Sequence, residues 1–195
     1  DIVREAYRLK IPFLSLYAFS TENWKRPQKE IDNLMILLQR FLVKYIDELT
    51  ENGVNLNIMG DISALDGKTR EMVEMALDRT SHGDEMTLNI GLNYGGQDEI
   101  VRAVRRIASL VQEGVLDPEA VDKSIFESHL YTKDQPPLDL LIRPSGELRV
   151  SNFMLYQMAY SEFWFSNVLW PDFDEKVFNT AIDDYRTRDR RFGGL

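Results

Sequence analysis

The chain has 195 residues, which suits a single domain with appendages, and its 44% hydrophobic and 28% charged residues are typical of globular proteins. Its 32 acidic residues outnumber its 23 basic residues, and the net charge of −9 argues against bulk binding to nucleic acid, which needs a basic surface. The sequence contains no cysteine, which excludes disulfides, thiolate metal sites and cysteine nucleophiles.

Helical and strand patterns alternate along the chain. Apolar residues at helical spacing indicate the helices, and short continuous apolar runs indicate the buried strands. The predicted helices cover residues 1–10, 27–50, 66–81, a segment from a cap at Asp98 to about Val111, 117–130 and 174–188. The predicted strands cover residues 12–19, 54–60, 86–94, 138–143 and 161–166. This alternation predicts one α/β domain over residues 1–195, with a mostly parallel sheet flanked by helices.

Ligands of such sheets bind at the carboxyl ends of the strands, so the segment after each strand is informative. After the first predicted strand, residues 19–27 (FSTENWKRP) place hydroxyl, carboxylate, amide, indole and guanidinium groups in one turn. The candidate site residues of this turn are Ser20, Asn23, Trp24 and Arg26. An equally good interpretation is a turn into a helix, with Ser20 or Thr21 as cap and Trp24 filling the core.

The segment RPSGELRVSN (143–152) follows the fourth predicted strand. Its candidate ligand residues are Arg143, Arg149 and Ser151. Two guanidinium groups and hydroxyls around a flexible glycine suit a diphosphate clamp. The alternative is that the arginines pair with Glu147 or Glu162 in a surface loop.

Glu162 enters a strongly aromatic strand, where a carboxylate is costly unless it is paired or bound to metal. An arginine partner and Mg²⁺ fit the spacing equally well. Gly95 and Gly96 after the third strand allow either a ligand approach or a tight turn. The apolar helix 27–50 faces the core or lines an apolar tunnel. Together these segments predict a site for a diphosphate with Mg²⁺.

Three segments resemble signature segments of the cis-prenyltransferase family, whose bacterial type member is undecaprenyl diphosphate synthase. They read FSTENWKRP, LNIGLNYGGQDEIVRAV and DLLIRPSGELRVSNFMLYQMAYSEFWFSNVLWPDF. The resemblance implies an enzyme that uses Mg²⁺ to condense isopentenyl diphosphate, in cis, with an allylic diphosphate such as farnesyl diphosphate, giving a polyprenyl diphosphate. It also implies a six-stranded parallel sheet, an apolar tunnel, a homodimer and a cytoplasmic location with peripheral membrane association.

The resemblance assigns roles to the candidates. Arg143, Arg149 and Ser151 would bind isopentenyl diphosphate. Asn23, the expected catalytic residue with Ser20 beside it, would orient this substrate near the proton that it loses.

Further roles concern the allylic substrate, the metal and the partner subunit. Trp24 and Arg26 would shape and charge the allylic side of the site. Glu162 would support the Mg²⁺ site. Arg191 and Gly193 match the family's Arg-x-Gly tail, which reaches the active site of a partner subunit.

Two departures from the family pattern stand out. The family's Asp-Gly-Asn-Gly-Arg-Trp-type phosphate loop, with its Mg²⁺-binding Asp, has no counterpart here. We therefore expect the first strand and this loop to be missing, and residues 1–195 alone to be poorly active. Leu148 stands where members often carry a polar residue. An alternative function is a non-catalytic partner subunit of a prenyltransferase complex, although such partners have generally lost the Asn and Arg motifs that this chain retains.

Overall fold

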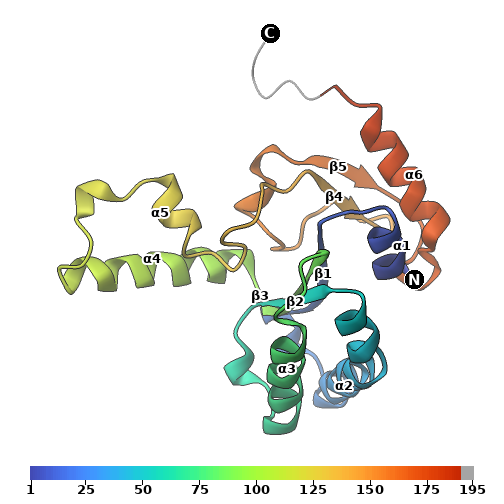
Figure 1. The fold of residues 1–195 in the computed structure, drawn as a ribbon, viewed down its shortest axis with the longest axis horizontal. Helices are drawn as coiled ribbons and strands as arrows, with labels where there is room; N and C mark the ends of the chain where they lie inside the picture. The colour runs from blue at the N-terminus through green and yellow to red at the C-terminus, as the bar shows by residue number, and fades with distance from the viewer. Residues whose placement is uncertain (190–195) are drawn as a thin grey trace.

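The computed structural model describes residues 1–189 (Figure 1). The α-helices are α1 (Ile2–Arg8), α2 (Gln28–Glu51), α3 (Gly67–Thr80), α4 (Gly96–Gln112), α5 (Lys123–Glu127) and α6 (Glu175–Arg186). The strands are β1 (Phe13–Ser20), β2 (Val54–Met59), β3 (Met86–Tyr94), β4 (Leu140–Arg143) and β5 (Glu162–Phe165). All five predicted strands are therefore confirmed, and the α/β class with them.

The strands form two parallel sheets. β1, β3 and β2 make a three-stranded sheet in that order, and β4 pairs with β5 in a second sheet. Within residues 1–189 the parallel strands are divided between two sheets rather than joined in one: β1 and β4 border the same cavities, but no backbone pairing joins them. The parallel direction of every pairing and the flanking helices agree with the prediction.

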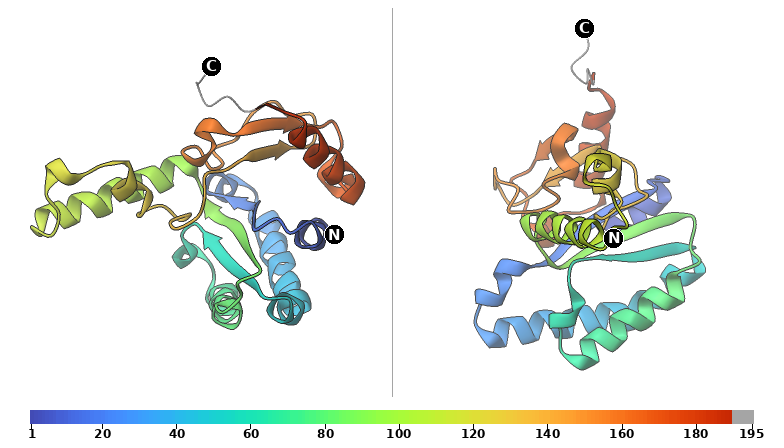
Figure 2. Two further views of the ribbon diagram at one scale, coloured as in Figure 1. Left: turned by 45° about the horizontal axis from the view of Figure 1, so that its top comes forward. Right: turned by 90° about the vertical axis from the view of Figure 1, so that its left-hand side faces the viewer.

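Part of the core lies between the three-stranded sheet and the helices α2 and α3, which cover one of its faces (Figure 2), and the same cluster continues to α1 and α6 through Ala6, Phe173 and Phe178. β3 is the central strand, and Leu88 on it is fully buried between Leu14 of β1 and Leu56 of β2. Burying one such leucine stabilises the fold by about 1.5–3 kcal/mol. α2 is helical because its apolar residues recur on one face, and that face packs on the sheet. Its buried residues are Ile31, Met35, Leu42, Ile46 and Leu49.

Two helix predictions need correction. α4 begins at Gly96 with Gly95 as its N-cap, so Asp98 lies inside the first turn rather than at the cap. The predicted helix 117–130 is a 3₁₀ turn followed by the short α5, because Asp122 caps α5 by accepting a hydrogen bond from the Ile125 backbone N–H at 2.9 Å. α4 and α5 extend together away from the sheets (Figure 1). No helix within residues 1–189 has the length and apolar character needed to cross a bilayer.

The amino-terminal helix is joined to α6 through a carboxylate. Glu5 of α1 is 4% exposed, and it accepts hydrogen bonds from the Arg8 side chain at 2.6 and 2.7 Å and from the Asn179 amide of α6. The hydrogen bonds from Arg8 and then Asn179 lower the pKa of Glu5 from 4.5 to about 2.

This carboxylate should link stability to pH. Because the folded pKa lies below the unfolded value, the contribution of Glu5 is complete above about pH 4.5 and is lost as the pH falls toward 2. We expect the free energy of unfolding of Glu5→Gln to lie below that of the unmodified protein at pH 6, with a smaller gap at pH 3. Urea unfolding at both pH values measures this, with the exposed Glu51→Gln as control. A gap that does not change with pH would contradict the assignment.

Candidate active site

Three strands end where the predicted site lies. β1 ends at Ser20, β3 at Tyr94 and β4 at Arg143, and each end leads into one of the segments singled out in the sequence. We refer to residues 20–26 as the β1 turn and to residues 143–152 as the β4 loop. A hydrogen bond of 2.8 Å from Asn152 to Glu22 joins them, so the expectation that these segments meet is confirmed.

The β1 turn is a capped 3₁₀ turn. The Ser20 backbone N–H donates to Asn23 Oδ1 at 2.9 Å within a capping box, so the capping interpretation holds for this pair. Trp24 does not fill the core: it is 37% exposed, and its indole N–H donates to Asn93 Oδ1 at 2.7 Å. Arg26 is exposed and pairs with Glu30 at 2.6 Å. The turn therefore presents its polar groups at the end of β1.

The β4 loop brings two of its three candidate ligand residues together. Arg143 Nη2 lies 3.4 Å from Ser151 Oγ, while the buried Arg143 Nε has no hydrogen-bond partner. An unpartnered buried N–H is costly, and here it leaves a guanidinium donor available for an acceptor such as a phosphate oxygen. Arg149 instead forms an exposed ion pair with Glu147, as the alternative interpretation of this loop anticipated.

The β4 loop contains several residues with left-handed backbone conformation and is held by backbone hydrogen bonds. Ser145, Gly146 and Ser151 have positive φ angles of 71°, 69° and 51°. The Ser145 and Gly146 N–H groups donate to the carbonyls of Val168 and Ser166, each at 2.8 Å. Left-handed residues held by hydrogen bonds mark a pre-organised loop, although each non-glycine one costs of order 1 kcal/mol.

The two glycines after β3 allow another part of the chain to approach closely. A Cβ atom on Gly95 would lie 2.5 Å from Asp98 Oδ2 and 2.8 Å from both Asn152 Nδ2 and Thr21 Oγ1. A Cβ atom on Gly96 would lie 2.8 Å from the Leu155 side chain. The glycines are required because the chain after the β4 loop packs directly on the start of α4.

A buried carboxylate, which the sequence analysis missed, anchors the chain that follows the β4 loop. Glu99 of α4 is 1% exposed and accepts hydrogen bonds from the Tyr94 hydroxyl at 2.6 Å, the Tyr131 N–H at 2.7 Å and the Gln157 amide at 3.1 Å. Burial, followed by the Glu99 charge, raises the pKa of Tyr94. Glu99 gave no signal in the sequence, because acidic residues are common in the first turn of any helix.

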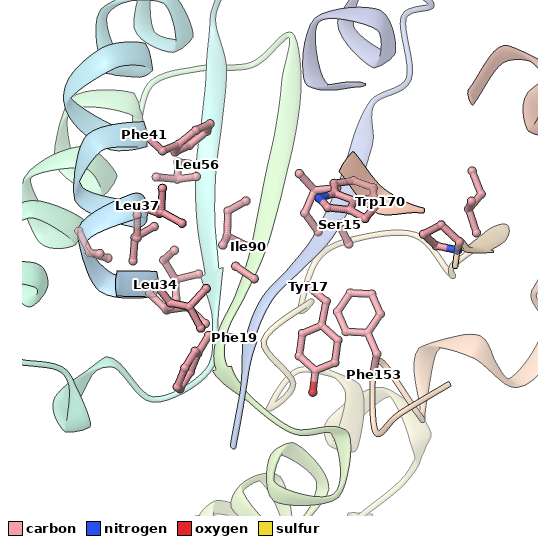
Figure 3. Close-up of a pocket in the computed structure, with 18 of the residues that line it drawn as sticks. Ser15, Tyr17, Phe19, Leu34, Leu37, Phe41, Leu56, Ile90, Phe153 and Trp170 are labelled. Atoms are coloured by element: carbon pink, nitrogen blue, oxygen red, sulfur yellow. The ribbon is translucent and has the colours of Figure 1, made fainter. Parts of the chain in front are cut away.

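An apolar cavity of about 610 Å³ opens beside Arg143 (Figure 3). Its walls come from α2, from the three-stranded sheet and from the chain near β4. Apolar lining residues are Leu34, Leu37, Phe41, Leu56, Ile90, Phe153 and Trp170. Tyr17 packs on Phe153 with ring centroids 4.4 Å apart, and burial raises its pKa to about 12, so the hydroxyl stays neutral. α2 thus both faces the core and lines the cavity.

The predicted metal ligand is engaged in an ion pair. Glu162 Oε2 accepts from Arg188 Nη1 at 2.9 Å, which is the arginine alternative foreseen for this carboxylate. Within residues 1–189 no cluster of three or more His, Cys, Asp or Glu residues is placed to hold a metal ion. Glu162 and the other side chains of residues 1–189 therefore do not form a complete metal site by themselves. The predicted tail residues Arg191 and Gly193 lie outside the described residues.

Comparison with known proteins gives matches along the whole chain. A family model described as "Putative undecaprenyl diphosphate synthase" matches residues 1–193. The isoprenyl transferase of Clostridium tetani is 48% identical over 195 residues, covering 100% of this chain and 76% of that protein. The isoprenyl transferase of Bacillus subtilis is 50% identical over 190 residues, covering 97% of this chain and 73% of that protein.

Two solved structures share the fold. Lavandulyl diphosphate synthase from Lavandula x intermedia, in complex with dimethylallyl diphosphate, superposes with a TM-score of 0.95 at 36% identity, covering 98% of this chain and 83% of that one. A probable undecaprenyl diphosphate synthase from Campylobacter jejuni superposes with a TM-score of 0.85 at 35% identity, covering 98% and 88%. The arrangement of strands and helices in this chain is therefore that of the two synthases.

The close approach at Gly95 can be tested by adding one methyl group. Gly95→Ala places a Cβ against three polar side-chain atoms, and such overpacking costs about 1–3 kcal/mol, so we expect Tm to fall by about 2–10 °C. Gly67→Ala is the matched control, because nothing lies within 4 Å of the new Cβ. Thermal unfolding compares the two variants. An equal Tm for both would show that the β4 loop does not pack on α4 as described.

Proposed function

The chain belongs to the undecaprenyl diphosphate synthase family of prenyltransferases, and from this premise we propose that it condenses isopentenyl diphosphate with an allylic diphosphate to lengthen a prenyl chain. Farnesyl diphosphate is the allylic substrate that we favour. The complex of the lavandulyl diphosphate synthase with dimethylallyl diphosphate supports an allylic diphosphate as the substrate class. The proposed product is a polyprenyl diphosphate of the kind that serves as a lipid-carrier precursor.

The observation that carries the proposal is the position of Arg143. Its guanidinium group, with the unpartnered Nε, lies beside an apolar cavity of about 610 Å³. A diphosphate held by Arg143 and Ser151 would place its hydrocarbon part against apolar walls. This combination of an anion-binding rim and an apolar interior matches a substrate with a charged head and an isoprenoid tail.

The residues of the site suit the bond changes of this reaction. The allylic C–O bond breaks as the new carbon–carbon bond forms, and the leaving diphosphate gains negative charge, which guanidinium groups stabilise in the transition state. The apolar cavity would keep water away from the cationic carbon. The Asn23 amide is a poor base, so we assign it the role of orienting isopentenyl diphosphate, with Ser20 beside it. A substrate diphosphate oxygen then takes the proton.

The remaining candidates complete this proposal. Trp24 and Arg26 border the allylic side, and Arg149 joins the clamp by exchanging its Glu147 partner for a substrate phosphate. Mg²⁺ in proteins is commonly held by one or two carboxylates together with substrate phosphates, so Glu162 would serve as one ligand after release from Arg188. Bound Mg²⁺ would neutralise diphosphate charge.

We also propose that the protein is a cytoplasmic homodimer. We further propose that it contacts a membrane peripherally, because a polyprenyl product partitions into lipid. The aromatic face of β5 supports the dimer: Phe163 and Phe165 stack on each other and are exposed by 36% and 42%. Aromatic side chains are enriched in protein interfaces.

Turnover tests the proposed reaction directly. The full-length protein, incubated with Mg²⁺, farnesyl diphosphate and radiolabelled isopentenyl diphosphate, should give labelled product that extracts into butanol. EDTA should abolish product formation, and excess Mg²⁺ should restore it. A folded full-length preparation that yields no labelled product with any allylic diphosphate would refute the reaction, and full activity in EDTA would refute the role of the metal.

Arg143 offers a second test. Arg143→Ala removes charge-assisted hydrogen bonds worth about 1.5–3 kcal/mol, so the KM for isopentenyl diphosphate should rise by about 10- to 100-fold. Arg105→Ala, at an exposed position on α4, is the control and should leave KM unchanged. Steady-state kinetics with saturating allylic diphosphate measure both variants. An unaltered KM in Arg143→Ala would remove this residue from the clamp.

A further inference from the structure

Asn152 connects three segments that carry or support the site. Its Oδ1 accepts from the Gln97 backbone N–H at 2.9 Å, and its Nδ2 donates to Glu22 Oε1 at 2.8 Å. Its own carbonyl accepts from the Gly96 N–H at 2.7 Å. One residue of the β4 loop therefore bonds both to the start of α4 and to the β1 turn.

The residue at this position needs an amide side chain. The neighbour on one side is a backbone donor and the neighbour on the other side is a carboxylate, so position 152 must accept and donate at once. Partial burial raises the pKa of Glu22, but hydrogen bonds from Asn152, from its own backbone and from Ser20 and Thr21 outweigh this and lower the net pKa. Glu22 is then an ionised acceptor at neutral pH.

The backbone at this point also favours asparagine. Asn152 has φ of 62°, in the left-handed region that asparagine tolerates better than most residues. Ser151, the preceding residue, lies 3.4 Å from the Arg143 guanidinium group. Glu22 immediately precedes Asn23 in the β1 turn. The hydrogen bond between Asn152 and Glu22 thus joins the neighbours of two candidate site residues that are far apart in sequence.

We propose that Asn152 is a positioning residue, which holds the β4 loop at a fixed distance from the β1 turn so that the substrate bound by the loop is aligned with Asn23. The inference rests on the proposed function. The link from Thr21 Oγ1 to Asp98 Oδ2, at 3.0 Å, holds the same β1 turn to α4 but does not reach the β4 loop. Alignment between the turn and the loop therefore depends on Asn152.

Exchanging the donor and the acceptor of this hydrogen bond tests the proposal. Asn152→Asp keeps an acceptor for the Gln97 N–H but opposes Glu22 with a second carboxylate. We expect kcat to fall by about 10- to 100-fold, as for a misalignment on the order of 1 Å, while the KM for isopentenyl diphosphate changes less than about threefold. Adding Glu22→Gln in a double variant supplies an amide donor to the carboxylate introduced at position 152, and kcat should recover by about tenfold.

Two controls separate positioning from folding and from the reaction itself. Asn52→Asp makes the same chemical change at the exposed end of α2 and should leave kcat unaltered. Thermal unfolding should show that single and double variants are folded at the assay temperature. Unmodified protein without turnover would refute the proposed function. If the unmodified protein is active, the inference alone is overturned by an Asn152→Asp variant with unaltered kcat, or by a double variant no faster than Asn152→Asp.

Discussion

The site depends on the close packing of the chain after β4 against the start of α4. Gly95 and Gly96 favour this contact because they have no side chains, since a Cβ atom on either would lie 2.8 Å or less from its nearest neighbour. Asn152 fixes the contact on its exposed side through the Gln97 N–H, and Glu99 fixes it on its buried side by accepting a hydrogen bond from Gln157. Two sheets that share no backbone pairing within residues 1–189 are thereby held together at the carboxyl ends of β3 and β4.

The same arrangement separates the charged part of the site from its apolar part. Hydroxyl, amide and guanidinium groups gather at the strand ends, whereas the cavity behind them is lined mainly by aliphatic and aromatic side chains (Figure 3). Arg143 belongs to both regions, because it ends β4 and also lines the cavity. Electrostatic interactions at such a boundary are stronger than in water, since one side of the charge faces a medium of low dielectric constant.

Local signals predicted most elements and fewer of the contacts. The strand patterns located all five strands, and the α2 pattern located a helix of 24 residues almost to its ends. The segment 117–130 is predicted as one helix because Asp117-Pro118 is a helix start signal, but Asp122 caps a second, separate helix and the segment is divided. Helix propensity is judged over a window of many residues, so the effect of a single capping side chain inside that window is not detected.

The α/β class, the parallel strands, the segments that meet at the strand ends and the family to which they point could all be predicted without a structure. Periodicity, turn residues and motif order are properties of the chain itself, so they can be read from the sequence without a structure. The folded structure was needed to show that Arg143 has an unpartnered buried donor while Arg149 and Glu162 are paired. It was also needed to show that Asn152 joins the β4 loop to the β1 turn. The Asn152–Glu22 and Arg188–Glu162 contacts join residues far apart in sequence, and the pairing of Arg149 with Glu147 depends on the backbone conformation of the β4 loop, so folding alone sets them.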